Sequence, residues 1–470
     1  MRISLSLPLT VEEIAAAIGS KCAENCQNTV ITHLTTDSRT VGRGDLFLAL
    51  RGERTDGNAY LPQAFSSGAA AAICERKCPD GLCLTVPDAL LALGALAEYY
   101  ASKIPHKTVA VTGSIGKTTT KEFLRCVLSE KFRVHATEGN HNNEIGLPYT
   151  VLSMKADTEI LILEMGMTGL GEIEYLSNLA HPDIGIVTTI GTSHLERLGT
   201  RENICRAKME ITAGMKAGSL LLLQGDEVLL QNQKNHPLSP KMCSYTAGDY
   251  ALGALTTNES ETVFDAFLLH TALTDCRIPM AGKHAAMAAL FALAAAEHFG
   301  MTEEDMKRGL LAYRTDALRQ SKSTHTLTRG DECLHLTVIR DCYNAAPESM
   351  RAAIDVLCMT AKKQGGRAVA LLGDMKELGE NSKELHRSVG EYAAKAGISL
   401  LVTYGENADT IADGALLHGM RAECVVKISN GDCERAAEML FSLSKENDTV
   451  LFKASRAMQA ERVADRLINR

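Results

Sequence analysis

The chain has 470 residues, of which 45% are hydrophobic and 23% are charged, and its formal net charge is −8. This length is enough for about three domains with sizeable cores. The acidic balance, without any lysine- or arginine-rich run, argues against a nucleic-acid partner held by phosphate contacts. No stretch approaches the roughly 20 apolar residues of a membrane span, and the N-terminus lacks the basic start and apolar core of a signal peptide. Fourteen cysteines in such a chain therefore suggest reduced thiols and a cytoplasmic protein.

The first section of the chain, residues 1–85, mixes short β-rich runs with Gly-Asp and Asp-Gly turns. Thr10 and Glu13 form a capping-box pattern in front of apolar residues at helical spacing. We therefore expect a short strand and then a helix that begins near Thr10. A second, amphipathic helix is expected near residues 61–67.

The second and third sections alternate strands with helices, which predicts parallel sheets. The second section, residues 86–315, opens with an alanine-rich helix, and the third section, residues 320–470, is of dinucleotide-fold type. Strands are expected at 108–112, 159–164, 184–190 and 219–223 in the second section, and near 368–372, 399–403, 423–428 and 449–453 in the third. The predicted fold class is thus α/β.

The run KTVAVTGSIGKTTT joins an apolar strand to a glycine turn and a helix expected over residues 118–132. Gly113 and Gly116 let the backbone turn its N–H groups toward phosphate oxygens. Lys117 can reach the β and γ phosphates of a nucleotide, and the Thr118 hydroxyl can bind Mg²⁺. A valine occupies the first glycine position of the usual motif and the loop is short, so this is a variant phosphate-binding loop.

Two further side chains follow apolar strands and are expected at the same edge of the sheet. The run EILILEMG places Glu164 at the carboxyl end of a strand, where a carboxylate can bind the Mg²⁺ of a nucleotide. The next strand, IGIVTTIG, is followed directly by Thr192, Ser193 and His194. Taken alone, His194 reads as an ordinary loop histidine, but its place beside Glu164 favours a role at the phosphate loop.

Five motifs stand out along the chain, namely TGSIGKTTT, TEGNHNNEIGLP, LEMG, GTSHLERLGT and AKMEI. Together they resemble those of the Mur ligases, the ATP-dependent amide-forming enzymes of peptidoglycan precursor synthesis. Within that family, the DSR triplet with GDLFLALRGERTDG, LLGDMKELGENSKELH and CYNAAPESM is similar to members that add D-alanyl-D-alanine to UDP-N-acetylmuramoyl-tripeptide. The resemblance covers essentially the whole chain. It implies a UDP-sugar-binding domain at 1–85, a central ATP-binding domain at 86–315 with a P-loop-type parallel sheet, and a Rossmann-like domain at 320–470 that binds the dipeptide.

The resemblance also implies a chemistry for particular residues. Lys208, which by itself reads as a solvated helix lysine, would be carbamylated by CO₂ and would hold a second Mg²⁺ together with His194. Thr118 and Glu164 would hold the first Mg²⁺. ATP would phosphorylate the tripeptide carboxylate, and the dipeptide amine would then attack the acyl phosphate. The catalytic residues are expected to be Lys117, Glu164, His194, Lys208 and Arg319, the last neutralising charge as phosphate is transferred.

The remaining expected contacts fall into three groups of residues. Taken singly, the UDP-sugar residues and Asn142 also fit ordinary turn roles, and Lys453 and Ser455 also fit a surface lysine and a helix cap. ATP is expected to contact Gly113, Ser114, Ile115, Gly116, Lys117, Thr118, Thr119, Asn142, His284, Arg319 and Asp341. The UDP-sugar is expected to contact Ser38, Arg39, Arg51, Gly52, Thr55 and Asn143. The dipeptide is expected to contact Tyr343, Asn344, Lys453 and Ser455.

Some positions depart from the family pattern and leave an alternative open. The departures are Gln224, Ala285, Ala288, Arg340 and Ala346. They allow a catalytically impaired or substrate-shifted paralogue that acts as a nucleotide-binding or regulatory protein. Such a protein would have lost Lys117, Glu164, His194 or Lys208, and all four residues are present here. A folylpolyglutamate-type ligase would lack the sugar-nucleotide section. The Mur ligase that adds the third amino acid would carry an Asp-Asn-Pro-Arg motif. A simple hydrolase or kinase needs neither the first nor the third section of the chain. We expect a monomer.

Overall fold

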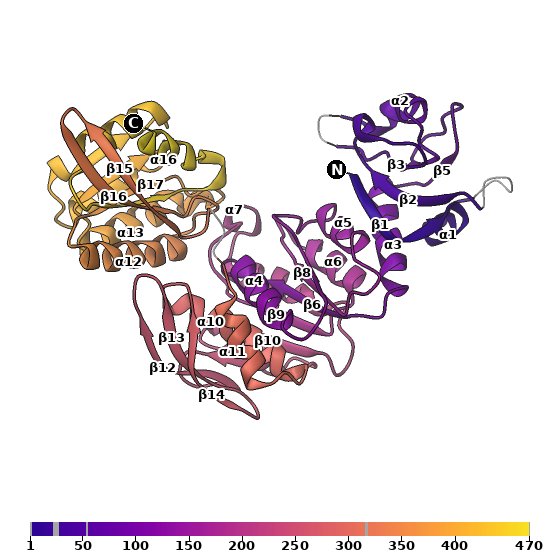
Figure 1. Ribbon diagram of the computed structural model, residues 1–470, viewed down its shortest axis with the longest axis horizontal. Coiled ribbons are helices and arrows are strands. Elements are labelled where there is room, and N and C mark those ends of the chain that lie inside the picture. Colours follow the sequence, from indigo (N-terminus) through magenta and orange to yellow (C-terminus); the bar gives the residue numbers. More distant parts are fainter. Residues whose placement is uncertain (1, 22–27, 53–54, 315–317, 470) are drawn as a thin grey trace.

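The computed structural model describes residues 2–21, 28–52, 55–314 and 318–469. This part of the chain forms three α/β units, each built on its own sheet. The N-terminal and C-terminal units lie at opposite ends of the molecule, and the central unit lies between them (Figure 1). The predicted three-domain α/β architecture is confirmed. The ligand assigned to each unit and the limits of the three sections stay predictions.

The N-terminal unit has a sheet of order β1-β2-β3-β4-β5, in which only β1 and β2 pair antiparallel. The predicted capping box is confirmed, because the Glu13 N–H donates to the Thr10 side chain and the Thr10 N–H donates to Glu13 Oε2. The elements are β1 (Arg2–Thr10), α1 (Val11–Ala17), β2 (Val30–Thr35), β3 (Leu46–Leu48), α2 (Leu61–Ser66), β4 (Ala71–Cys74) and β5 (Cys83–Thr85).

The central unit has a larger sheet of order β14-β13-β12-β11-β10-β9-β6-β8-β7. Strand β6 lies between β8 and β9 and runs parallel to both, so the carboxyl ends of these three strands meet at one edge. The strands are β6 (Lys107–Thr112), β7 (Val134–Ala136), β8 (Ile160–Glu164), β9 (Ile184–Val187), β10 (Leu220–Gln224), β11 (Lys241–Ser244), β12 (Tyr250–Thr257), β13 (Thr262–Phe267) and β14 (Ala272–Ile278).

The parallel sheet that the sequence predicts is correct around the phosphate loop but incomplete at one edge. Strand β12 still pairs parallel with β11, but β12 and β13 pair antiparallel, as do β13 and β14. A four-residue turn joins β12 to β13, and so short a connection permits only antiparallel pairing. The side chains of β13 alternate between buried and less buried positions, as expected where one face of a sheet is partly open to solvent.

Helices on both faces of the central sheet fix the phosphate loop in place. The alanine-rich α10 packs against α4, the helix that begins at the loop, and its small side chains allow close approach. Helix α4 ends at residue 128, before the expected residue 132, because the chain continues in turns. The helices are α3 (Ala89–Ser102), α4 (Lys117–Leu128), α5 (Gly146–Leu152), α6 (Glu172–Ala180), α7 (Leu195–Leu198), α8 (Arg201–Met209), α9 (Val228–Gln231), α10 (Lys283–His298) and α11 (Glu303–Leu311).

The C-terminal unit has a sheet of order β15-β16-β20-β17-β18-β19. Strands β15 and β16 form an antiparallel hairpin, and the other strands run parallel with helices between them. No helix within the described ranges combines the length and the apolar character that crossing a bilayer requires. The elements are β15 (Ser321–Arg329), β16 (Glu332–Arg340), α12 (Pro347–Gln364), β17 (Ala368–Gly373), α13 (Ser382–Lys395), β18 (Leu400–Tyr404), α14 (Asp409–Leu417), β19 (Val425–Ile428), α15 (Cys433–Leu443), β20 (Thr449–Lys453) and α16 (Glu461–Ile468).

Candidate functional site

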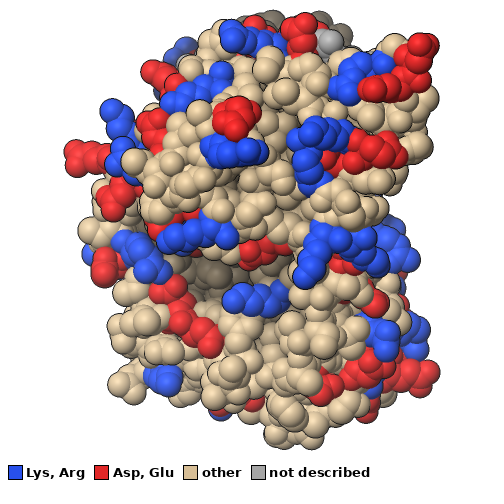
Figure 2. Space-filling view, turned by 90° about the vertical axis from the view of Figure 1, so that its left-hand side faces the viewer, with Lys and Arg blue, Asp and Glu red and all other residues tan. Residues whose placement is uncertain are grey.

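A cleft of about 970 Å³ lies where the central unit meets the C-terminal unit. Seen from the C-terminal side, the surface is hollowed between an upper and a lower part, and lysine and arginine side chains lie near the rim (Figure 2). The phosphate loop, the ends of β8 and β9, helix α8 and the start of α12 line the cleft. Its lining includes every residue of the expected catalytic set, namely Lys117, Glu164, His194, Lys208 and Arg319.

The two glycines of the phosphate loop have the backbone conformations that the sequence argument requires. Gly113 has φ +148° and Gly116 has φ +88°. A Cβ atom on Gly113 would lie 1.9 Å from Thr188 Oγ1, so only glycine fits there. The Lys117 ammonium donates to the Gly113 carbonyl at 2.7 Å. The lysine thus folds back over the loop, toward the place where phosphates would bind.

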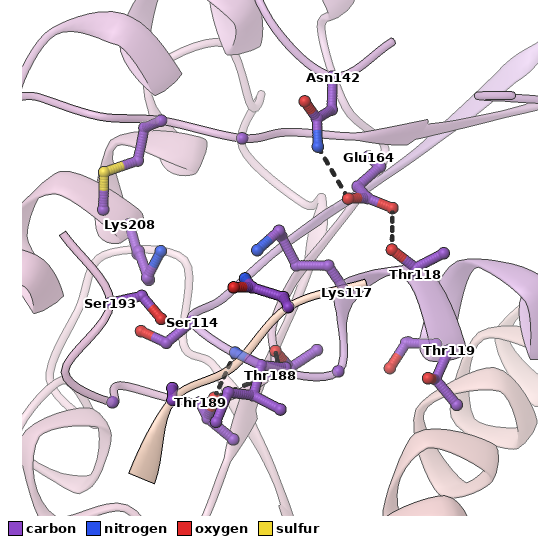
Figure 3. A pocket seen from close by; sticks show the side chains of 18 of the residues that line it. Ser114, Lys117, Thr118, Thr119, Asn142, Glu164, Thr188, Thr189, Ser193 and Lys208 are labelled. Carbon is purple, nitrogen blue, oxygen red and sulfur yellow. Dashed lines mark hydrogen bonds between the residues drawn. The ribbon is translucent and has the colours of Figure 1, made fainter. Parts of the chain in front are cut away.

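Two threonines after β9 hold the phosphate loop, and the sequence analysis did not identify them. Thr188 Oγ1 donates to the Ile115 carbonyl at 2.6 Å, and the Ile115 N–H donates to Thr189 Oγ1 at 3.1 Å (Figure 3). The Ser114 N–H donates to the Thr189 carbonyl at 2.9 Å. The available signal was a pair of hydroxyl residues directly after a buried strand that is parallel to the strand of the loop.

Glu164 is the buried carboxylate of the site, with 3% of its surface exposed. Its Oε2 accepts from Thr118 Oγ1 at 2.8 Å, and its Oε1 accepts from Asn142 Nδ2 at 2.9 Å (Figure 3). Asn142, expected at the nucleotide, therefore orients the carboxylate. The hydroxyl and carboxylate oxygens lie side by side on the cleft, and such oxygen donors fit Mg²⁺.

Lys208 lies on α8 with only 2% of its surface exposed, which contradicts its reading as a solvated helix lysine. Burial and the nearby Lys117 ammonium lower the pKa of Lys208 well below its ordinary value. Burial also lowers the pKa of Lys117, and the Arg319 guanidinium contributes. Both lysines point into the same space (Figure 3). Across the described ranges, no group of three or more His, Cys, Asp or Glu side chains is arranged to hold a metal ion.

His194 lies at the start of α7, as expected from its place after β9, and it contacts a residue that the sequence analysis did not identify. Its Nδ1 lies 2.5 Å from Glu377 Oε2, which belongs to the C-terminal unit. The hydrogen bond with His194 lowers the pKa of Glu377. No local pattern could have revealed this pair, because its members are far apart in the chain and belong to different sheets.

The residues that follow the central unit pack against each other at the cleft. The Arg319 guanidinium lies 4.0 Å from the centre of the Tyr343 ring, which is a cation–π arrangement. Gln320 Nε2 lies 3.1 Å from His284 Nε2, and burial lowers the pKa of His284. Arg319, expected at the nucleotide, and Tyr343, expected at the dipeptide, are thus in direct contact.

Asp341 and Lys453, assigned to different ligands by resemblance, form one ion pair. Lys453 Nζ donates to Asp341 Oδ2 at 2.6 Å and to the Asn344 carbonyl at 3.1 Å. Lys453 is 2% exposed, so these oxygens replace the water around its ammonium. Ser455 is not among the residues that line the cleft, and its Oγ accepts from the Lys376 N–H instead.

The residues expected at the UDP-sugar lie in the N-terminal unit, away from this cleft, except for Asn143. Ser38 donates to Gln63, Arg39 forms an ion pair with Asp37, and Arg51 forms one with Glu75. The Gly52 N–H donates to the Thr55 carbonyl, which closes a turn. Asn143 lines the cleft beside Asn142. The structure therefore separates the expected sugar-nucleotide residues into two places.

The positions that depart from the family pattern differ in their relation to the cleft. Gln224, Ala288 and Ala346 line it, whereas Ala285 is buried and is not part of the lining. Arg340 forms an ion pair with Asp465 and is not part of the lining either. Arg340 therefore differs from the departures that line the cleft, because its side chain is paired on α16 instead.

Comparison with protein families matches most of the chain. The model of the Mur ligase middle domain matches residues 111–296, and that of the Mur ligase, glutamate ligase domain matches residues 327–456. The model described as Mur ligase family, catalytic domain, matches residues 30–80. All three models belong to one family, and they follow the order of the three structural units.

Individual relatives match over nearly their full length. The UDP-N-acetylmuramoyl-tripeptide--D-alanyl-D-alanine ligase of Bacillus subtilis is 38% identical over 98% of both chains, and that of Synechocystis is 34% identical over 93% of this chain and 92% of its own. The crystal structure of MurF from Acinetobacter baumannii has a TM-score of 0.88 at 28% identity and full coverage of both chains. MurF ligase from Thermotoga maritima in complex with ADP has a TM-score of 0.79 at 29% identity, covering 93% of this chain and 97% of its own.

Proposed function

This chain belongs to the Mur ligase family, and we propose that it joins D-alanyl-D-alanine to UDP-N-acetylmuramoyl-tripeptide with cleavage of ATP to ADP and phosphate. The product is the pentapeptide precursor of peptidoglycan. One observation of this structure carries the proposal: a single cleft holds the phosphate loop, a buried carboxylate, a histidine and two lysines of lowered pKa. We propose a cytoplasmic location, where ATP is available.

The first step would transfer the γ-phosphate of ATP to the terminal carboxylate of the tripeptide. Two anions must approach each other, so cations are needed at the site of transfer. Lys117 folds over the phosphate loop, and Arg319 lines the same cleft. These two side chains would neutralise the charge that develops as ADP leaves and the acyl phosphate forms.

The second step would form the amide bond. The free amine of D-alanyl-D-alanine attacks the acyl carbon, the tetrahedral intermediate loses inorganic phosphate, and the amine loses a proton. Tyr343, Asn344 and Lys453 reach the cleft from the C-terminal unit, and we assign them to the dipeptide side. The N-terminal unit would hold the UDP-sugar through the residues expected there.

We assign two Mg²⁺ sites to residues of this cleft. Thr118 and Glu164 would hold the ion that accompanies ATP, because their oxygens are adjacent and face the cleft. His194 and Lys208 would hold the second, with Lys208 as its carbamate. A lysine of lowered pKa supports this, since only the neutral amine reacts with CO₂. Bound Mg²⁺ would neutralise charge on the transferring phosphate.

The decisive experiment measures phosphate release from ATP by the purified protein, with and without each substrate, while mass spectrometry follows the pentapeptide product. We expect release that depends on both UDP-N-acetylmuramoyl-tripeptide and D-alanyl-D-alanine, together with the product mass. ATP turnover with neither substrate would indicate a hydrolase instead. Nucleotide binding without turnover under any substrate pair would refute the ligase.

A further inference from the structure

The loop after β17 reaches from the C-terminal unit to helix α7 of the central unit. Glu377 Oε2 lies 2.5 Å from His194 Nδ1, and the Glu196 N–H donates to the Glu377 carbonyl at 3.2 Å. Gly379 packs so closely on the same helix that a Cβ atom there would lie 3.0 Å from Glu196 Cα. In Figure 1, α7 lies on the side of the central unit that faces the C-terminal unit. Side chain and backbone thus both join the two units at this point.

The conformation of this loop is set within the C-terminal unit itself. The Met375 N–H donates to His386 Nε2 at 2.9 Å. The Lys376 N–H donates to Ser455 Oγ, also at 2.9 Å. These two bonds fix the backbone directly before Glu377. Glu377 is therefore presented to the central unit from a fixed loop, and its carboxylate can define the orientation of whatever it contacts.

Both members of the pair have unusual backbone conformations. His194 and Glu377 each have φ +65°, in the left-handed region that side-chain-bearing residues rarely adopt. Such conformations persist where surrounding contacts determine them, and they gather at functional sites. Here two of them meet, and together they bring an imidazole and a carboxylate into contact across the boundary between two units.

We propose that Glu377 is a positioning residue that orients the His194 ring when the C-terminal unit is docked on the central unit. A carboxylate only accepts hydrogen bonds, so Nδ1 must carry the proton. In the neutral ring, Nε2 then keeps its lone pair and is the nitrogen available to a ligand in the cleft. A carboxylate partner of this kind fixes the tautomer and orientation of a metal-binding histidine.

This inference rests on the proposed function, because it gives domain docking a consequence for phosphate transfer. His194 would present Nε2 correctly only in the docked arrangement. The acyl phosphate would therefore form only when the cleft is closed by the C-terminal unit, which protects that intermediate from water.

The test compares Glu377→Ala with Glu377→Gln and with Glu380→Ala, an exposed glutamate on the same loop. In Glu377→Ala, we expect product formation to need about 10- to 100-fold more Mg²⁺ for half-maximal rate, the usual effect of losing such a partner. Glu377→Gln keeps an oxygen that accepts from Nδ1–H and should retain most of the wild-type response. Glu380→Ala should match the wild type.

A second readout needs no turnover. Nitrogen-15 spectra of histidine-labelled protein distinguish the two ring tautomers, and His194→Gln identifies the signals of His194. We expect Nδ1–H in the wild type and loss of that preference in Glu377→Ala. Equal Mg²⁺ dependence of Glu377→Ala and Glu380→Ala would overturn the inference, as would an unchanged tautomer. If X-ray scattering shows that Glu377→Ala merely separates the units while the tautomer is unchanged, Glu377 is a latch and the inference fails.

The two failures can be told apart. A wild-type protein that forms no pentapeptide would refute the proposed function, whatever the variants do. A wild-type protein that forms pentapeptide, with a tautomer independent of Glu377, would refute only the role of Glu377.

Discussion

Replacing Lys208 by methionine should make the folded protein more stable while it abolishes turnover. Burial and the Lys117 ammonium lower the pKa of Lys208 well below 10.5. In the unfolded chain the amine titrates near its ordinary value. Between the two pKa values the unfolded chain binds a proton that the folded protein does not bind. The free energy of unfolding therefore rises with pH, by about 1.4 kcal/mol per pH unit, up to the ordinary pKa. It falls correspondingly as the pH is lowered toward the folded pKa.

Methionine has a similar length and no titrating group, so the variant lacks this contribution. When the pH is lowered from 9 to 8, the free energy of unfolding of Lys208→Met should rise by about 1.4 kcal/mol relative to that of the wild type. The assay is urea unfolding of both proteins at half-unit pH steps in CO₂-free buffer, which keeps the amine uncarbamylated. Titrating groups remote from Lys208 are common to both proteins and cancel in the difference. Stability curves that run parallel over this range would refute the argument that the folded site lowers the pKa of Lys208.

Three further predictions concern the same cleft. Lys208→Ala should lose ligase activity that added Mg²⁺ does not restore and that short carboxylates such as formate partly restore; full activity in this variant would remove the carbamate proposal. Gly113→Ala should weaken ADP binding by about tenfold or more in calorimetry, because its Cβ would lie 1.9 Å from a threonine hydroxyl, whereas Gly139→Ala meets open space and should bind ADP as the wild type does. Unchanged affinity in Gly113→Ala would contradict this reading of the loop. Asp341→Ala should destabilise the protein by roughly 3 kcal/mol, since it leaves the buried Lys453 ammonium without its carboxylate, and an unfolding midpoint equal to that of the wild type would contradict it.

Local patterns were sufficient where neighbouring residues along the chain determine the structure. The capping box of Thr10 and Glu13 formed as predicted, because both hydrogen bonds lie within one turn. Glu164 and His194 lie at the expected edge of the central sheet, because Glu164 ends the buried strand β8 and His194 lies in the segment after β9. The burial of Lys208 could not be deduced from its own helix, where the lysine taken alone reads as solvated, because burial depends on what packs against α8.

Other features depend on contacts between residues that are distant in the chain. The Thr188 and Thr189 hydrogen bonds to the phosphate loop join segments more than 70 residues apart. The antiparallel edge of the central sheet was missed for another reason: its hairpins are local, but no strands were expected at residues 250–278. Sequence motifs show which residue types are present at a site, but hydrogen-bond partners are known only once the chain has folded.

The sequence by itself determined the phosphate loop, the order of the three α/β units and the resemblance to a ligase family. Each of these depends on short stretches of sequence, where glycine conformation, strand ends and helix starts follow from neighbouring residues. Only the tertiary structure decided that Asp341 neutralises Lys453, that Lys208 is buried beside Lys117, and that Glu377 contacts His194. The reason is physical: burial, pKa shifts and ion pairs depend on distances in space, and these arise only when segments far apart in the chain pack together.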